Sequence, residues 1–180
     1  MAQRGSRKLE VTLPSPTEIR YRRGFDAPKH LVFEALTKPE HVRRWWCCMD
    51  GYTMPVCEID LRVGGHWRYV MVGEDGGEVA FHGVYTKIDA PDRLDHTEIF
   101  EPFPDVESTI TATFVERDGQ THYEALQVFP NQEARDGVIA SGMEVGADIA
   151  YDRLEGIAQE LAGAATTGAT SRSPQVPARG

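Results

Sequence analysis

Between residues 53 and 128, short stretches of alternating apolar and polar residues are separated by turn-forming residues. The turn signals fall at Gly64-Gly65, Gly76-Gly77, Pro91-Asp92 and Asp118-Gly119. The connections are too short for parallel crossovers, so neighbouring strands must run antiparallel. The pattern predicts an antiparallel sheet of about seven strands, over residues 18–25, 53–61, 65–72, 78–89, 93–101, 107–116 and 120–128.

Two short helices are predicted between the first strand and this meander. Asp26 is in position to cap the first helix, and Pro28 falls in its first turn. Pro39 opens the second helix, in which Trp45 and Trp46 follow Val42 at helical spacing. The two helices are therefore expected to present apolar faces to the sheet.

A long helix is predicted over residues 131–161, because this segment has no proline and repeats apolar residues every three or four positions. At 1.5 Å per residue, about 30 residues span roughly 45 Å, which is enough to cross a whole sheet. We predict one continuous helix.

The ends of the chain lack the apolar patterning of the middle. Residues 162–180 contain small, polar and proline residues that cannot bury enough apolar surface to become ordered. We predict a flexible N-terminal arm over 1–16, one domain over 17–161 and a disordered C-terminal tail over 162–180.

Composition narrows the class of protein. The 180 residues are 41% hydrophobic and 26% charged, as in one ordinary globular domain. The net charge of −9 disfavours a nucleic-acid partner, and no apolar run is long enough to span a membrane. The first residues lack a secretion signal, and Cys47 and Cys48 are adjacent among three cysteines, so we expect reduced thiols in the cytoplasm and no membrane partner.

Several short motifs identify a family resemblance that covers residues 20–160. The chain resembles the START-like (SRPBCC) superfamily, which includes polyketide cyclases and the birch pollen allergen. Within it, the chain is similar to the bacterial branch that resembles the C-terminal domain of the activator of heat-shock-protein ATPase. The motifs are Phe25-Asp26-Ala27-Pro28, Ala35-Leu36-Thr37 with Pro39-Glu40, Trp45-Trp46, Asp60 to Gly65, Gly83 with Pro91 and Leu94, and Gly142-Met143 through Gly146 to Arg153-Leu154.

The resemblance implies an α+β helix-grip fold, in which a curved antiparallel sheet and a long C-terminal helix enclose a cavity. It says little about the ligand, because this fold hosts carriers, cyclases and chaperone regulators. The chain departs from the expected pattern after Trp46, where Cys47, Cys48 and Met49 replace a small polar or glycine-proline stretch. This departure affects the loop at the mouth of the expected cavity.

Strand parity places both small and aromatic residues on the inner face of the sheet. Gly83, Ala112, Gly142, Gly146 and Ala150 would leave room for a ligand between aromatic walls. The alternative is that large and small side chains interdigitate in a filled core. The predicted ligand-binding residues are Trp46, Trp67, Tyr69, Phe81, Tyr85, His96, Glu98, Phe100, Phe114, Met143 and Gly146.

Glu98 is the residue with the widest range of possible chemical roles, because strand parity puts its carboxyl group on the inner face beside His96. Burial of a carboxylate is unfavourable without a partner. Glu98 could anchor a ligand, act as a general acid or base, or pair with an arginine or lie at the open end of the sheet. It is the weak candidate for catalysis, and no other catalytic residue is predicted.

No metal or cofactor site is predicted. Cys47, Cys48, Cys57 and His66 are close in sequence, but their spacing fits no zinc motif. Asp60 and Arg62 flank a turn and are expected to form a structural ion pair.

The leading hypothesis is binding of a small apolar or amphipathic molecule in the cavity. A cyclase or hydrolase that uses the same cavity is one alternative, and a protein-interaction domain like the chaperone ATPase regulator is another. The sequence also allows a homodimer through the sheet edge or the short helices.

Overall fold

The computed structural model describes residues 7–47 and 50–169 of the chain. Its strands are β1 (Glu10–Thr12), β2 (Glu18–Phe25), β3 (Tyr52–Ile59), β4 (His66–Gly73), β5 (Glu78–Asp89), β6 (Arg93–Phe100), β7 (Glu107–Arg117) and β8 (Gln120–Val128). Its helices are α1 (Lys29–Thr37), α2 (Pro39–Trp45), α3 (Gln132–Ala140) and α4 (Met143–Ala169). The predicted positions of the strands and of the two short helices are confirmed within a few residues.

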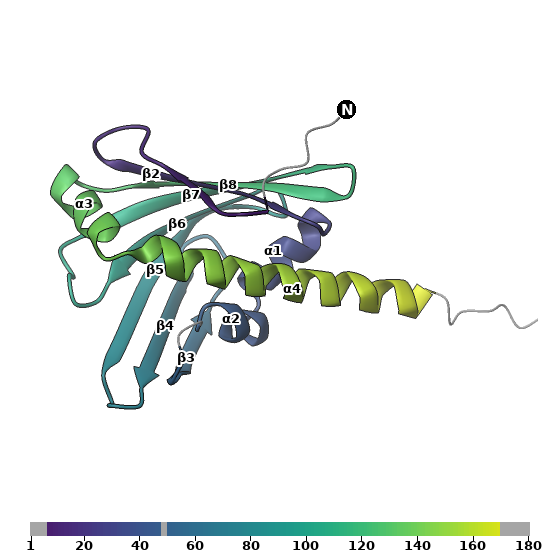
Figure 1. Cartoon of the computed structure of the whole chain (residues 1–180), viewed down its shortest axis with the longest axis horizontal. Coiled ribbons are helices and arrows are strands. Elements are labelled where there is room, and N and C mark those ends of the chain that lie inside the picture. Colours follow the sequence, from purple (N-terminus) through teal and green to yellow (C-terminus); the bar gives the residue numbers. More distant parts are fainter. Residues whose placement is uncertain (1–6, 48–49, 170–180) are drawn as a thin grey trace, which may run out of the picture.

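All eight strands form one antiparallel sheet in the order β1-β2-β8-β7-β6-β5-β4-β3. Each pair of neighbours is consecutive in the chain except β2 and β8, which join the two ends of the domain. The sheet is strongly curved, and α4 crosses it with α1 and α2 packed beside the helix (Figure 1). This arrangement is the helix-grip fold, and it confirms the predicted fold class.

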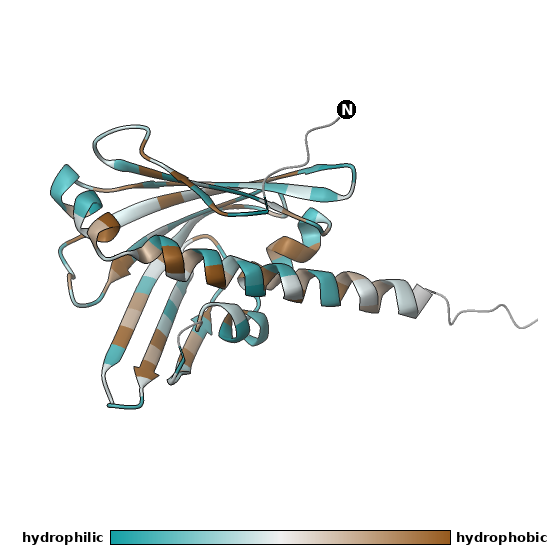
Figure 2. Cartoon of the chain, viewed as in Figure 1, coloured by the Kyte–Doolittle hydropathy of each residue, from teal (hydrophilic) through white to brown (hydrophobic). Residues whose placement is uncertain are grey.

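Alternation along the strands sorts residues between the two faces of the sheet (Figure 2). On β4, Trp67, Tyr69 and Met71 are buried, whereas Arg68 between them is exposed. Their cross-strand partners on β5 follow the same parity, with Tyr69 opposite Phe81. The inner face of the sheet therefore carries the residues that the periodicity of two predicted.

The predicted N-terminal arm is wrong for residues 10–12, which form the edge strand β1. Val11 pairs with Tyr21 of β2 and packs against the core, next to the buried Leu9. The backbone N–H of Leu9 also donates to Asp148 Oδ1 on α4, at 3.0 Å. Two apolar side chains in a basic segment are enough to hold a three-residue strand when a sheet edge is available.

The predicted single helix over 131–161 is wrong, because the chain breaks between α3 and α4. Gly142 has φ +72°, a left-handed conformation that glycine adopts without steric cost. Asn131 caps α3, where its side chain accepts a hydrogen bond of 2.9 Å from the N–H of Ala134. The two helices can therefore take different directions over the sheet.

The predicted disordered tail is wrong for residues 162–169, since α4 continues to Ala169. Alanine is the strongest helix former, and the hydroxyls of Thr166 and Thr167 donate to helix carbonyls four residues earlier, so the last turns are locally stable. They carry no strongly apolar side chains, as the pale end of α4 in Figure 2 shows. Residues 170–180 lie outside the described part of the chain.

Two smaller predictions concern Asp26 and Asp60. Asp26 does not cap α1, because the N-cap residue is Pro28 and the Asp26 carboxylate accepts from Gln120 Nε2 at 2.7 Å instead. The Asp60–Arg62 ion pair is confirmed at 2.8 Å. Neither feature changes the architecture.

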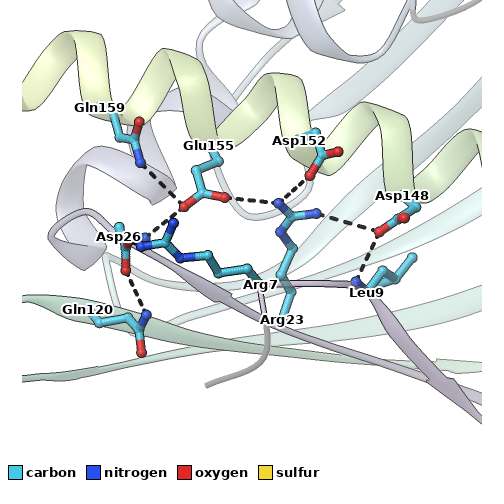
Figure 3. A network of polar contacts seen from close by, with 9 residues as sticks. All are labelled: Arg7, Leu9, Arg23, Asp26, Gln120, Asp148, Asp152, Glu155 and Gln159. Atoms are coloured by element: carbon cyan, nitrogen blue, oxygen red, sulfur yellow. Dashed lines mark hydrogen bonds and ion pairs between the residues drawn. The ribbon is translucent and has the colours of Figure 1, made fainter. Parts of the chain in front are cut away.

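An ionic cluster fixes α4 against β2 (Figure 3). Arg23 is almost completely buried, and its Nη2 donates to Asp152 at 2.6 Å and to Glu155 at 2.9 Å. Asp148, one turn earlier on α4, lies 3.7 Å from Nη1. The guanidinium also lies 5.4 Å from the ring centroid of Phe25. Three acidic residues on one face of α4 therefore surround a single buried cation.

Apolar packing holds the middle of α4. Leu154, Ile157 and Ala158 are buried, and α4 packs against α1 and α2. Within residues 7–47 and 50–169, no helix has both the length and the apolar character needed to cross a membrane.

Candidate functional site

The two adjacent tryptophans of α2 have different roles. Trp45 is buried, and its indole N–H donates to the carbonyl of Ala35 at 2.9 Å. Trp46 is half-buried and lies over the inner face of the sheet, with ring-centroid distances of 5.1 Å to Tyr69 and 5.8 Å to Phe81. Trp45 thus completes the core, and Trp46 keeps accessible surface above the sheet, a division that the sequence left open.

The predicted aromatic wall is a continuous cluster of rings over β4, β5 and β6. Phe81 stacks on Phe100 with a centroid distance of 4.9 Å. Trp67 lies 4.8 Å from Tyr69 and 5.7 Å from the imidazole of His96. The structure therefore brings together seven of the predicted residues, namely Trp46, Trp67, Tyr69, Phe81, Tyr85, His96 and Phe100.

Phe114 lies apart from this cluster. It is fully buried, and its ring packs 5.6 Å from Phe33 of α1 and 5.3 Å from Tyr123 of β8. Phe25 joins the same group through Tyr123. These rings form a filled core under α1 and the middle of α4, where Phe25 and Tyr123 contact Tyr151.

A chain of hydrogen bonds crosses the inner face from β2 to β6. The Tyr21 hydroxyl donates to Gln127 Oε1 at 2.9 Å. Gln127 Nε2 in turn donates to Glu98 Oε1 at 3.1 Å and to Ser108 Oγ at 2.8 Å. Tyr21, Gln127 and Ser108 were not among the predicted site residues, although strand parity places them on the same face as Glu98.

Burial raises the pKa of Glu98 to about 7, although the hydrogen bond from Gln127 favours the ionised form. Its second oxygen, Oε2, has no donor among the described residues. No lysine or arginine of the described chain pairs with this carboxylate, so the arginine partner that the sequence allowed is not formed. Glu98 is therefore a half-buried acid on the inner face with spare hydrogen-bonding capacity.

His96 lies two residues before Glu98, on the same face of β6. Burial lowers the pKa of its imidazole to about 4, despite the opposing charge of Asp95, so the ring is neutral at pH 7. Its Nδ1 is buried and has no hydrogen-bond partner in the described part of the chain. Glu98 and His96 thus share one face with unused polar atoms among aromatic rings.

The inner face differs between its two ends. Under the middle of α4, Phe25, Phe114 and Leu154 are fully buried. Near the start of α4 the inward side chains are only half-buried: Phe81, His96, Glu98, Phe100, Ile110, Met143 and Ala147. Gly146 is on this part of α4, and a Cβ built on it would have no neighbour within 4 Å. The inward side chains at this end of the sheet therefore keep accessible surface that α4 does not cover.

A family model described as activator of Hsp90 ATPase homolog 1-like protein matches residues 26–159. The chain belongs to this family. Its matched segment contains the aromatic cluster, Glu98 and His96, and most of α4. The resemblance to the START-like superfamily and to this branch of it is thereby confirmed.

Solved structures support the family assignment. A protein from Rhodobacter sphaeroides is 28% identical with a TM-score of 0.78, over 87% of this chain and 99% of that chain. A protein from Mycobacterium smegmatis is 26% identical with a TM-score of 0.70, over 82% and 96%. An AHSA1-like protein from Aeromonas hydrophila, 18% identical over 88% and 99%, shares the fold with a TM-score of 0.62. A search of curated proteins found no match.

Gly83 does not leave room for a ligand, contrary to the sequence-based interpretation. A Cβ at this position would lie 1.8 Å from the carbonyl oxygen of Thr97 and 2.7 Å from Trp67 Nε1. The same indole nitrogen donates to the Thr97 carbonyl at 3.2 Å. In this family member, Gly83 therefore allows β6 to approach β5 closely at the residue next to Glu98.

The cysteines have structural surroundings. Cys57 is buried, its Sγ lies 3.7 Å from the carbonyl oxygen of Pro39, and burial raises the pKa of its thiol to about 11. Cys47 Sγ lies 3.5 Å from the carbonyl oxygen of Tyr52. Cys48 and Met49 are outside the described residues. Elsewhere in the described chain, no three His, Cys, Asp or Glu side chains are grouped to hold a metal ion.

Glu98 and His96 are expected to give the stability of this fold opposite dependences on pH. The pKa of Glu98 is raised, so the folded state keeps a proton that the unfolded state releases, and stability falls as pH rises from about 4.5 to about 7. The pKa of His96 is lowered, so stability falls as pH decreases from about 6.5 to about 4. The two effects oppose each other between these limits.

Replacing Glu98 with glutamine removes one of the two effects. As pH rises from about 5 to about 8, wild type should lose stability that Glu98→Gln keeps. The unfolding free energy of the variant relative to wild type should therefore increase by about 2 kcal/mol over this interval, since one pKa unit corresponds to about 1.4 kcal/mol. Urea denaturation at both pH values measures the gain. The exposed Glu160→Gln serves as the control. A stability difference between Glu98→Gln and wild type that stays constant with pH would contradict the assignment.

Proposed function

We propose that the chain binds a small apolar or amphipathic molecule between α4 and the inner face of β4, β5 and β6. The observation that carries this proposal is the contrast along α4: apolar side chains are fully buried beneath its middle, around Leu154, and keep accessible surface beneath its first turns. Half-buried rings on the inner side of a sheet are what a ligand would cover. The alternative interpretation, a wholly filled core, describes the part of the interior around Phe114.

The energetics of such binding rest on burial of apolar area. Covering about 200 Å² of apolar surface contributes on the order of 5 kcal/mol before the entropic cost of association. Micromolar affinity is therefore within reach without a catalytic step. Trp46, Phe81 and Phe100 would supply most of the apolar contact, while Glu98 and His96 would supply polar contacts.

We also propose that the protein acts in the cytoplasm. Cys57 is a free thiol, and it is buried beneath Pro39 at the start of α2. Unpaired cysteines are typical of reducing compartments. A bacterial source is consistent with the organisms in which the similar solved structures occur.

Gly146→Leu tests the binding proposal. The leucine side chain has space at this position, so it should fill the unfilled end of the interior without unfolding the domain. We expect the affinity for N-phenyl-1-naphthylamine, an uncharged fluorescent dye, to fall about tenfold or more, as when a pocket is occluded. Native mass spectrometry of the wild-type protein should also reveal a co-purifying small molecule.

Gly156→Leu is the matched control, because Gly156 is on the exposed side of the same helix and also has no neighbour within 4 Å of an added Cβ. Its dye affinity should equal that of wild type. A wild-type protein that neither binds the dye nor carries a ligand would refute the proposal. Equal losses in the two variants would do so as well.

A further inference from the structure

Arg23 and Glu98 both lie on the inner face of the sheet, and their partners are very different. Arg23 is surrounded by Asp148, Asp152 and Glu155 of α4, so its charge is compensated within the chain. Glu98 has one hydrogen bond, from the uncharged amide of Gln127. The interior therefore contains an anionic group whose positive partner is absent from the described part of the chain.

The surroundings of Glu98 add negative or neutral groups. Gln127 and the hydroxyl groups of Tyr21, Tyr123 and Tyr151 approach it from β2, β8 and α4, and these tyrosines stay protonated because burial raises their pKa. His96 approaches along β6 as a neutral ring. Glu144, an exposed residue of the first turn of α4, adds a further carboxylate near Tyr21. An anionic ligand would meet like charge here.

The aromatic rings near His96 are suited to a positive charge. The faces of tryptophan, tyrosine and phenylalanine rings attract ammonium groups, most strongly where water is excluded. Trp67 and Tyr85 both lie within about 6 Å of the His96 ring by centroid distance, at 5.7 Å and 6.1 Å. In the tautomer protonated on Nε2, the unpartnered Nδ1 of His96 is a hydrogen-bond acceptor.

We propose that the ligand of the inner face is a hydrophobic organic cation, an amine on an aromatic or aliphatic skeleton, whose ammonium group pairs with Glu98 and whose apolar part lies against the aromatic cluster. This inference rests on the proposed function, because it names the chemical class of the molecule bound there. A neutral alcohol would leave the charge of Glu98 uncompensated. A bare metal ion would find only one carboxylate, since no group of three potential ligands is present in the described residues.

The test compares three molecules that share one ring system but differ in charge. Isothermal titration calorimetry at about pH 8 would measure the affinities of 1-naphthylmethylamine, 1-naphthalenemethanol and 1-naphthoate. We expect the amine to bind about tenfold or more tightly than the alcohol, and the carboxylate to bind more weakly than both. Glu98→Gln should bring the amine and the alcohol to similar affinities.

Lowering the pH gives a second measurement that needs no variant. The preference for the amine over the alcohol should fall between about pH 8 and pH 5, as Glu98 becomes protonated while His96 stays neutral. Glu160→Gln, which removes an exposed carboxylate of α4, should leave the preference unchanged.

The outcomes separate this inference from the proposed function. If the dye binds and Gly146→Leu abolishes its binding, the cavity is real whatever the charge preference. A carboxylate that then binds as tightly as the amine, or an amine preference that survives both Glu98→Gln and low pH, would overturn the cation assignment alone. A protein that binds none of the probes would overturn both.

Discussion

Arg23→Gln is expected to lower the free energy of unfolding by about 3–5 kcal/mol, the usual effect of removing one partner from a buried ion pair. The guanidinium is almost completely buried, and it satisfies Asp152 and Glu155 while approaching Asp148. Without it, these carboxylates lie along one face of α4 with no cation from β2 between them. Urea denaturation followed by tryptophan fluorescence measures the loss.

Arg44→Gln is the appropriate control for Arg23. Arg44 also pairs with a carboxylate of α4, Glu160, at 2.7 Å, but both side chains are exposed. Exposed ion pairs contribute about 0–1 kcal/mol, so this variant should remain close to wild type. Similar losses in both variants would show that burial of Arg23 is not what anchors α4.

Gly83→Ala is expected to destabilise the domain by about 3 kcal/mol or more, although it adds only one methyl group. The new Cβ would overlap the Thr97 carbonyl, a backbone atom that cannot move without shifting β6 away from β5. The shift would also break the hydrogen bond from Trp67 Nε1 to Thr97. Thermal unfolding measures the loss. Dye affinity should fall as well, because Glu98 follows Thr97 on β6 and would move with it.

Gly137→Ala provides the contrast. Gly137 lies within α3, where an added Cβ meets nothing within 4 Å, so alanine should raise stability by up to about 1 kcal/mol through its higher helix propensity. A Gly83→Ala variant as stable as wild type would mean that the strands are less closely packed than the structure indicates.

The sheet could be predicted well because its information is local. Each turn from Gly64-Gly65 to Asp118-Gly119 consists of residues that favour chain reversal. Alternation of apolar and polar residues sets the face of every residue between the turns. The positions of seven of the eight strands and the antiparallel order of the last six followed from these signals alone. The pairing of β2 with β8 did not. β1 was missed because a three-residue strand contains too few alternations to stand out.

The long helix was predicted less well because its glycines look alike in the sequence. Gly137, Gly142, Gly146 and Gly156 all occur within the periodic segment, and only Gly142 takes a left-handed conformation. The apolar spacing continues across the break, so periodicity alone could not locate it.

The candidate site was partly predictable. Parity placed Glu98 and His96 inward, and the structure puts both among the aromatic rings. The partners of Glu98 come from β8 and β2. These strands lie near β6 only because β2 pairs with β8 and β8 pairs with β7. The same is true of Arg23, whose acidic partners on α4 are more than a hundred residues away in the chain. Their spacing of four and three residues on one helix face was the available signal.

The two edges of the sheet limit how the protein can associate with itself. β1 is three residues long, and β3 at the other edge contains Pro55, which has no N–H to donate, within a register shift between Thr53 and Val56. Short strands, prolines and bulges all prevent sheets from joining edge to edge. The protein should therefore resist growth into continuous intermolecular sheets at high concentration, and a homodimer, if it forms, should use the short helices rather than a shared strand ladder.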